Sequence, residues 1–111
     1  MGKGLTKDQF LNYHAAVCEQ MIATVKAKNA DYTADNDDPF ANFSTVEDLG
    51  LCSTEIGFLV RLNDKFARLR SFVKIGTLKV KDESIEDTLI DMANYCILMA
   101  GYIKSKKLKA Q

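Results

Sequence analysis

The 111-residue sequence contains no tryptophan, one proline, one histidine and three cysteines. The cysteines are scattered and never form a C-x-x-C pair, which argues against a zinc site and against a disulfide framework. A single histidine leaves no second imidazole for a metal and proposes no nucleophile with its base. Zinc enzymes, disulfide-rich secreted domains and triad hydrolases are therefore poor matches to this chain.

Long apolar runs are missing as well. No stretch approaches the length of a membrane span, and the first residues lack the apolar region of a signal peptide. We therefore expect a cytoplasmic protein with no membrane partner. Fifteen basic and fifteen acidic residues cancel, so no overall positive field attracts nucleic acid. The sequence also lacks a G-x-S-x-G elbow, a P-loop and a dinucleotide fingerprint.

Apolar residues instead recur at helical spacing along most of the chain. They make up 47% of the sequence, which is normal for a globular protein. We expect one domain over residues 1–111, with residues 1–5 and 105–111 frayed. The pattern predicts three long helices and one short helix, an all-α bundle. Their expected ranges are about Lys7–Lys28, Thr45–Leu49, Thr54–Val73 and Asp82–Lys104.

Each long helix carries an apolar row that we expect to be buried. His14 lies in the row of the first helix and is expected half-buried between helices. The row of the next long helix is Phe58 or Leu59, Leu62, Phe66 and Leu69. The row of the last helix is Ile85, Leu89, Met92, Cys96 and Met99. Because the second half of the last helix is apolar on nearly every face, we expect self-association, most simply a homodimer, to cover it.

Local signals predict how the segments begin and meet. Capping boxes are expected at Thr6–Gln9 and at Ser44–Glu47. Gly57 costs about 1 kcal/mol of helix stability relative to alanine, so it suits a place where another backbone or a ligand approaches closely. The irregular segment before the short helix carries three aromatic rings that we expect to dock on the helices. These rings belong to Tyr32, Phe40 and Phe43.

Polar residues on the last helix form the best functional candidate. Asp87, Asp91 and Asn94 stand at i, i+4 and i+7, which places three oxygen-bearing side chains in one column. Magnesium prefers oxygen ligands and is usually shared with substrate phosphates. Arg61, Lys65 and Arg68 share one face of the preceding helix and would orient those phosphates. The alternative for both groups is a solvated helix face.

A third carboxylate would complete the predicted magnesium site. Glu55 is our first choice as metal ligand and catalytic residue beside Asp87 and Asp91. With antiparallel helices, however, Glu55 falls at the end far from the connector whereas Asp87 lies near it. Asp64 or a residue of a partner chain is therefore an alternative ligand.

Four segments together resemble a known group of proteins. They read Lys28-Asn-Ala-Asp-Tyr32, Asp38-Pro-Phe-Ala-Asn-Phe43, Arg61-x-x-Asp-Lys65-x-x-Arg68-Leu69 and Asp82-Glu-Ser-Ile-Glu-Asp-Thr-Leu-Ile-Asp-Met-Ala-Asn-Tyr95. The chain resembles small phage and prophage proteins described as nucleotide-modification-associated domains, which look related to the MazG-like all-α nucleoside triphosphate pyrophosphatases. The resemblance implies a helical bundle, oligomerisation, magnesium, and cleavage between the α and β phosphates of a nucleotide.

The pyrophosphatase motif is incomplete here. Those enzymes use E-x-x-E on one helix and E-x-x-D on the next. Asp91 fits the final acid, but Thr88 stands three residues before it, and Glu55 is followed at i+3 by Phe58. We therefore expect a magnesium-dependent nucleotide pyrophosphatase, with a non-catalytic nucleotide-binding protein or a ligand-free helical interaction protein as alternatives. The expected substrate-binding residues are Asp31, Tyr32, Arg61, Lys65, Arg68, Asn94 and Tyr95.

Overall fold

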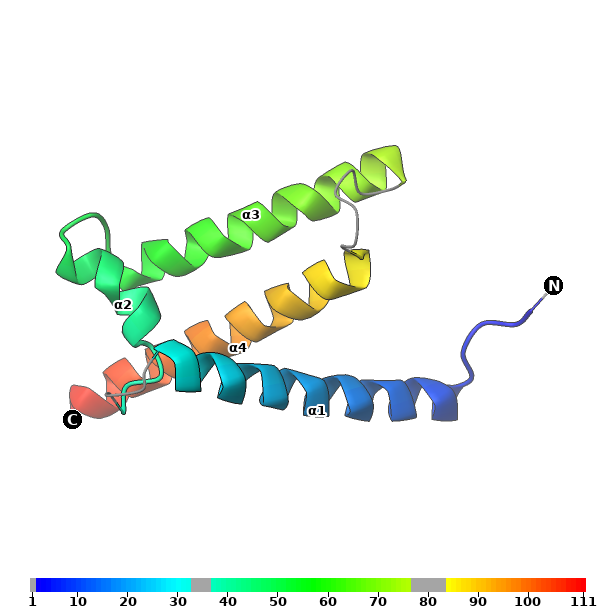
Figure 1. Cartoon of the computed structure of the whole chain (residues 1–111), viewed down its shortest axis with the longest axis horizontal. Helices are drawn as coiled ribbons and strands as arrows, with labels where there is room; N and C mark the ends of the chain where they lie inside the picture. The colour runs from blue at the N-terminus through cyan, green and yellow to red at the C-terminus, as the bar shows by residue number, and fades with distance from the viewer. Residues whose placement is uncertain (1, 33–36, 77–83) are drawn as a thin grey trace.

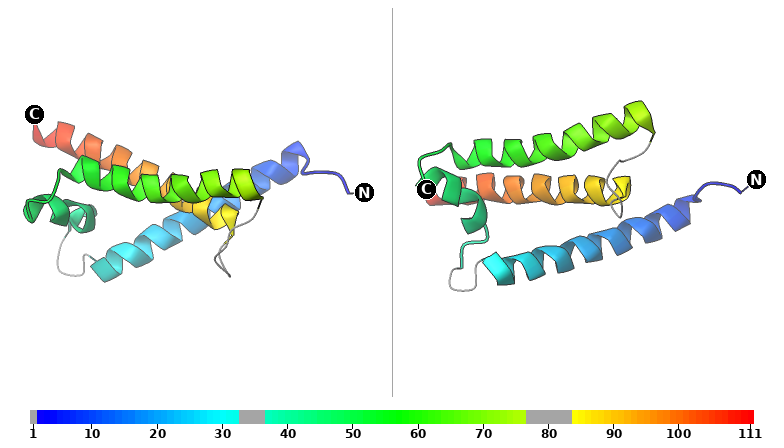
Figure 2. Two further views of the ribbon diagram at one scale, coloured as in Figure 1. Left: turned by 90° about the horizontal axis from the view of Figure 1, so that it is seen from above. Right: turned by 45° about the horizontal axis from the view of Figure 1, so that its top comes forward.

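The computed structural model describes residues 2–32, 37–76 and 84–111, and only the backbone of residues 29–32. The described residues form four α-helices and no strand, so the all-α prediction is confirmed. The helices are α1 (Lys7–Tyr32), α2 (Ala41–Asp48), α3 (Thr54–Ile75) and α4 (Ile85–Lys109). Helices α3 and α4 lie side by side in opposite directions, and the C-terminal half of α1 lies next to α4 (Figures 1 and 2).

Helices α1 and α3 begin where the sequence predicts, whereas α4 begins at Ile85 rather than at the predicted Asp82. At each start, polar side chains satisfy the first backbone N–H groups. The Gln9 N–H donates to Thr6 Oγ1 at 3.1 Å and the Thr6 N–H donates to Gln9 Oε1 at 3.0 Å, which confirms this capping box. The hydroxyls of Ser53 and Ser84 accept N–H groups at the starts of α3 and α4. Gly76 ends α3 with φ of 90°, a conformation that favours glycine.

Helix α2 differs from its predicted range of Thr45–Leu49, because it already begins at Ala41. The capping box predicted at Ser44 is wrong, since the Ser44 hydroxyl donates to the Ala41 carbonyl at 3.2 Å inside the first turn. The Glu47 carboxylate accepts the Thr54 N–H at 3.0 Å instead. Glu47 thus ties α2 to the start of α3.

A small aromatic cluster forms the centre of the fold. Phe58 on α3 is 0% exposed, and its ring stacks on Phe43 of α2 with centroids 4.2 Å apart. The Tyr102 ring of α4 lies 5.9 Å from Phe58 and 5.7 Å from Phe40. These contacts confirm that Phe40 and Phe43 dock on the helices, whereas the Tyr32 side chain lies outside the described residues.

Two glycines allow this cluster to close. A Cβ atom at Gly57 would stand 3.1 Å from the Val46 side chain, and one at Gly101 would stand 3.3 Å from the Phe40 ring. Both distances are tighter than ordinary carbon contacts. A close approach is therefore present at Gly57, but it is made by the Val46 side chain of α2 and not by the backbone or ligand that was expected.

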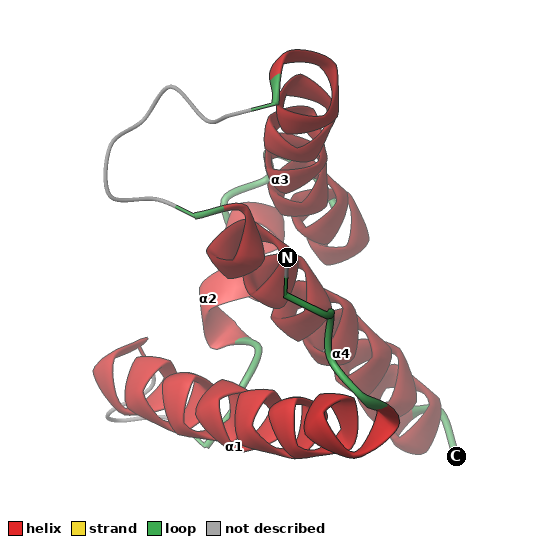
Figure 3. Cartoon of the chain, turned by 90° about the vertical axis from the view of Figure 1, so that its right-hand side faces the viewer, coloured by secondary structure: helices red, strands yellow, loops and turns green. Residues whose placement is uncertain are grey.

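Much of the apolar surface is not covered by the chain itself. The N-terminal half of α1 runs away from the α3–α4 pair, as Figures 1 and 3 show, so His14 is exposed and its predicted burial is wrong. Phe66, Leu89 and Cys96 are also exposed, although their helical spacing predicts burial. The radius of gyration is 16.8 Å, against about 13 Å expected for a compact domain of this length.

None of the described helices combines the length and the apolar character needed to cross a lipid bilayer.

Replacing Phe58 by alanine should lower the free energy of unfolding by about 3–5 kcal/mol, because a fully buried ring is lost and a cavity remains. The measurement is chemical denaturation followed by circular dichroism. Val60→Ala is the matched control, since Val60 lies on the same helix and is 55% exposed. If the two variants lose similar amounts of stability, Phe58 does not hold the centre of this fold.

Candidate functional site

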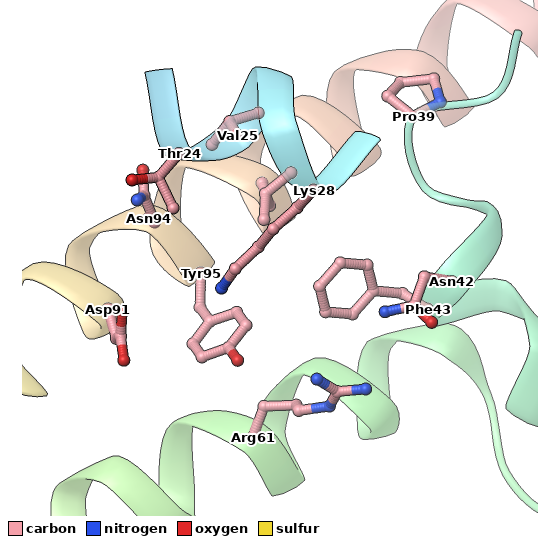
Figure 4. Close-up of a pocket in the computed structure, with 11 residues that line it drawn as sticks. Thr24, Val25, Lys28, Pro39, Asn42, Phe43, Arg61, Asp91, Asn94 and Tyr95 are labelled. Carbon is pink, nitrogen blue, oxygen red and sulfur yellow. The ribbon is translucent and has the colours of Figure 1, made fainter. Parts of the chain in front are cut away.

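A pocket of about 150 Å³ opens where α1, α2, α3 and α4 come together. Side chains from all four helices are directed toward one space (Figure 4). Its described lining residues are Thr24, Val25, Lys28, Pro39, Asn42, Phe43, Arg61, Asp91, Asn94, Tyr95 and Leu98. The pocket therefore depends on tertiary packing, since no single helix supplies more than part of its wall.

The charges around this pocket do not balance. Lys28 from α1 and Arg61 from α3 both line it, and their charged ends reach toward the same space (Figure 4). Asp91 is the one carboxylate among the described lining residues, and its Oδ2 lies 3.3 Å from Lys65 Nζ. Because Lys65 already offsets Asp91, the charges of Lys28 and Arg61 leave the described lining of the pocket positive. A positive pocket of this kind attracts an anion.

Aromatic and amide groups form the remaining walls. The Arg61 guanidinium lies 5.4 Å from the centre of the Phe43 ring, and the Tyr95 ring meets Phe43 edge-on at 6.1 Å. Cation–π contacts of this kind restrain the arginine without neutralising it. Asn42 and the buried Asn94 add amide groups that both donate and accept hydrogen bonds. The walls thus offer flat apolar surface together with polar edges.

Several residues expected at the site from the sequence do meet there. Arg61, Asp91, Asn94 and Tyr95 line the pocket, and Lys65 contacts Asp91 at its edge. The basic row of α3 was predicted to face the acidic column of α4, and the contact between Lys65 and Asp91 shows that it does so at this position.

Other predicted residues lie elsewhere. Asp87 is exposed in the first turn of α4, where its N–H donates to Ser84. Arg68 does not line the pocket, and the proposed alternative ligand Asp64 is exposed. The side chains of Asp31 and Tyr32 lie outside the described residues, so their roles stay predictions.

Lys28 is the pocket cation that sequence reasoning missed. It stands seven residues after Met21, on the same face of α1 that packs toward α4. Its register with Met21, the buried residue among the described side chains of α1, was the signal that could have identified it, although Lys28 itself is exposed.

The structure separates Glu55 from the other two predicted metal ligands. Glu55 Oε2 lies 3.0 Å from Lys106 Nζ, near the C-terminal end of α4. Asp91 stands 15 residues earlier on that helix, which is about 22 Å along its axis. The described residues contain no group of three His, Cys, Asp or Glu side chains that could hold a metal ion. These residues therefore do not bring three carboxylates together to bind magnesium.

Most of the pocket lies in the part of the chain that matches a known protein family. Residues 28–101 match a family described as nucleotide modification associated domain 1, which covers most of the chain. The chain belongs to this family. The predicted resemblance to nucleotide-modification-associated domains is thereby confirmed. In this member of the nucleotide modification associated domain 1 family, the matched range contains all described residues that line the pocket apart from Thr24 and Val25. No curated protein and no solved structure matches the chain.

The Glu55–Lys106 contact makes a pH-dependent contribution to stability. The hydrogen bond from Lys106 holds the pKa of Glu55 below its ordinary value of 4.5. A carboxyl group whose pKa is lowered by folding stabilises the fold above its unfolded pKa and loses that contribution as the pH falls through its folded pKa. Because the Glu55 side chain is 37% exposed, water screens the pair and the effect is small.

Glu55→Gln should therefore lower the melting temperature slightly at pH 7, and this difference from wild type should shrink as the pH falls below about 4. Thermal unfolding at a series of pH values measures it. A difference that stays constant down to acidic pH would mean that the charge of Glu55 does not stabilise the fold.

Proposed function

We propose that this protein binds a nucleotide, with the phosphates held between Lys28 and Arg61. The observation that carries the proposal is the uncompensated positive charge of a pocket whose described carboxylate is already paired with Lys65. Membership of a family named for nucleotide modification supports a nucleotide rather than another anion.

The two cations suit phosphate in different ways. The planar Arg61 guanidinium can donate two parallel hydrogen bonds to one phosphate, and its contact with Phe43 restrains its orientation. Lys28 comes from another helix and adds a flexible point charge on the opposite side. Oxygen atoms of a phosphate chain between them would replace the water that solvates both groups.

The rest of the wall suits a nucleoside. Tyr95 offers an aromatic surface next to the cations, and Asn42 and Asn94 offer amides that match the donor and acceptor edge of a base. One face of the Phe43 ring is occupied by Phe58. We therefore assign base contact to Tyr95 rather than to Phe43.

Hydrolysis of the nucleotide is the second candidate, and Asp91 is the observation that favours it. Magnesium commonly binds through one or two carboxylates together with substrate phosphates, so a single pocket carboxylate suits a metal that arrives with the nucleotide. A pyrophosphatase of the MazG-like kind would add water at the α phosphorus and break the bond to the oxygen that bridges the α and β phosphates. Binding needs only the described pocket, whereas hydrolysis needs ligands beyond Asp91.

Titration calorimetry with each of four dNTPs, in EDTA, tests the binding proposal. Wild type should bind at least one of them, and Arg61→Gln should weaken binding by about tenfold to a hundredfold, the range for a charged hydrogen bond. Arg70→Gln is the matched control, because Arg70 lies on the same helix over the Phe66 ring and outside the pocket. Equal affinities of these two variants, or no binding by wild type, would refute the proposal.

Asp91→Asn separates the role of the carboxylate from that of the cations. In EDTA this variant should bind the dNTP more tightly than wild type, because a negative charge leaves the pocket and Lys65 is released. The affinity of this variant for inorganic pyrophosphate, measured by the same titration, should also be higher than that of wild type. Weaker binding of both ligands would show that Asp91 does not oppose the phosphates.

Release of pyrophosphate from dNTPs in magnesium tests hydrolysis. The pyrophosphatase candidate requires release by wild type and its loss in Asp91→Asn, with Glu55→Gln retaining activity because Glu55 lies far from the pocket. If wild type releases no pyrophosphate, hydrolysis is refuted and nucleotide binding remains the proposed function.

A further inference from the structure

Two side chains suited to nucleophilic chemistry meet on the N-terminal half of α1, outside the pocket. The Sγ atom of Cys18 lies 3.7 Å from the Nδ1 atom of His14, a hydrogen-bonding distance for sulfur. Residues four apart on a helix stand on the same face one turn from each other, which explains the contact. The single histidine was not expected to pair with a nucleophile, so this contact corrects that expectation.

This contact distinguishes Cys18 from the other two cysteines. His14 is the only histidine of the sequence, and in the described residues it contacts Cys18 and not Cys52 or Cys96. Cys18 and Cys96 are both exposed, whereas Cys52 is half-buried. Exposure alone therefore does not separate Cys18 from Cys96. The imidazole does, and Cys96 provides a control within the same chain.

The position of the pair leaves it accessible and restrains its base. The N-terminal half of α1 runs away from the α3–α4 pair (Figures 1 and 3), and His14 and Cys18 are both exposed. The Phe10 ring lies one turn before His14, with ring centroids 6.2 Å apart. Contact with Phe10 on one side and Cys18 on the other limits the rotation of the imidazole. The base is thus held toward a thiol that small molecules in solution can reach.

A cysteine in this setting favours reaction with disulfides. The thiolate, and not the thiol, is the form of cysteine that attacks another atom. The Nδ1 atom of a neutral imidazole accepts a proton when the ring hydrogen is on Nε2. The imidazolium that results then stabilises the negative charge on the sulfur. Attack of a thiolate on a disulfide sulfur is how disulfides exchange.

We propose that Cys18 is a site of thiol–disulfide exchange with low-molecular-weight disulfides, with His14 as the base. His14 Nδ1 takes the proton from Cys18 Sγ, and this sulfur attacks one sulfur atom of the disulfide. The S–S bond of the reagent breaks, and a mixed disulfide forms at Cys18. The second sulfur leaves with the bonding electron pair, takes the proton from His14 and becomes a free thiol. One disulfide replaces another, so no further oxidant is needed.

The exchange site is separate from the nucleotide pocket. The first described residue of α1 that lines the pocket is Thr24. It stands six residues after Cys18, which is about 9 Å along the helix axis. Exchange at Cys18 therefore does not depend on binding of a nucleotide, and each of the two proposals can fail without the other.

The rate of reaction with dithiobis(nitrobenzoate), an aromatic disulfide whose released thiol absorbs visible light, tests the proposal. Two folded double variants are compared at pH 7 in EDTA. Cys52→Ser with Cys96→Ser retains Cys18, and Cys18→Ser with Cys52→Ser retains Cys96. The protein that retains Cys18 should react at least about tenfold faster, because a positioned base assists loss of the proton. Equal rates, or faster reaction of Cys96, would overturn the proposal.

His14→Gln tests the base directly, with folding checked by circular dichroism. In the protein that retains Cys18 it should lower the rate about tenfold at pH 7, and in the protein that retains Cys96 it should leave the rate unchanged. At alkaline pH the Cys18 proteins with and without His14 should react at similar rates, because the thiol then loses its proton to solvent. Any result at pH 7 other than a loss confined to Cys18 would refute the role of the imidazole.

Oxidised glutathione identifies the product on the wild-type chain. Peptide mapping by mass spectrometry at early times should place the mixed disulfide on Cys18, and dithiothreitol should remove it. A mixed disulfide that appears first on Cys96 or Cys52 would overturn the assignment.

Discussion

The stack of Phe43 on Phe58 is the contact on which the rest of this structure depends. It joins the short helix α2 to the second turn of α3, and the rings of Tyr95 and Tyr102 pack around it. The same Phe43 ring lies beneath the Arg61 guanidinium and meets the edge of Tyr95. The packing centre therefore also forms a wall of the pocket. The stability of the fold and the shape of the pocket are coupled here, because a shift of Phe43 would change both.

The electrostatics of the pocket follow from the way three helices meet. Lys28, Lys65 and Arg61 come from α1 and α3, whereas Asp91 comes from α4. One cation is used to hold the two antiparallel helices together through Asp91, and two remain directed toward the cavity. Both cations are exposed, so what strengthens their attraction for an anion is that two helices bring them to one space.

A chain of this size divides its apolar residues between two surfaces. The inner surface makes the aromatic cluster, whereas Phe66, Leu89 and Ile103 remain exposed on the outside. Both sets of residues follow the same helical periodicity, so their spacing does not tell which of them the chain itself covers.

The sequence by itself determined the helices, the cap at Thr6, the docking of Phe40 and Phe43, and the facing of Lys65 and Asp91. These features depend on periodicity, on local hydrogen bonds and on antiparallel pairing, all of which are local or follow from short connections. Tertiary structure alone decided that Glu55 pairs with Lys106, that Lys28 enters the pocket, and that Phe66 and His14 are exposed. Periodicity shows that a face is apolar but not what covers it, and spacing along one helix does not fix the distance to a residue on another.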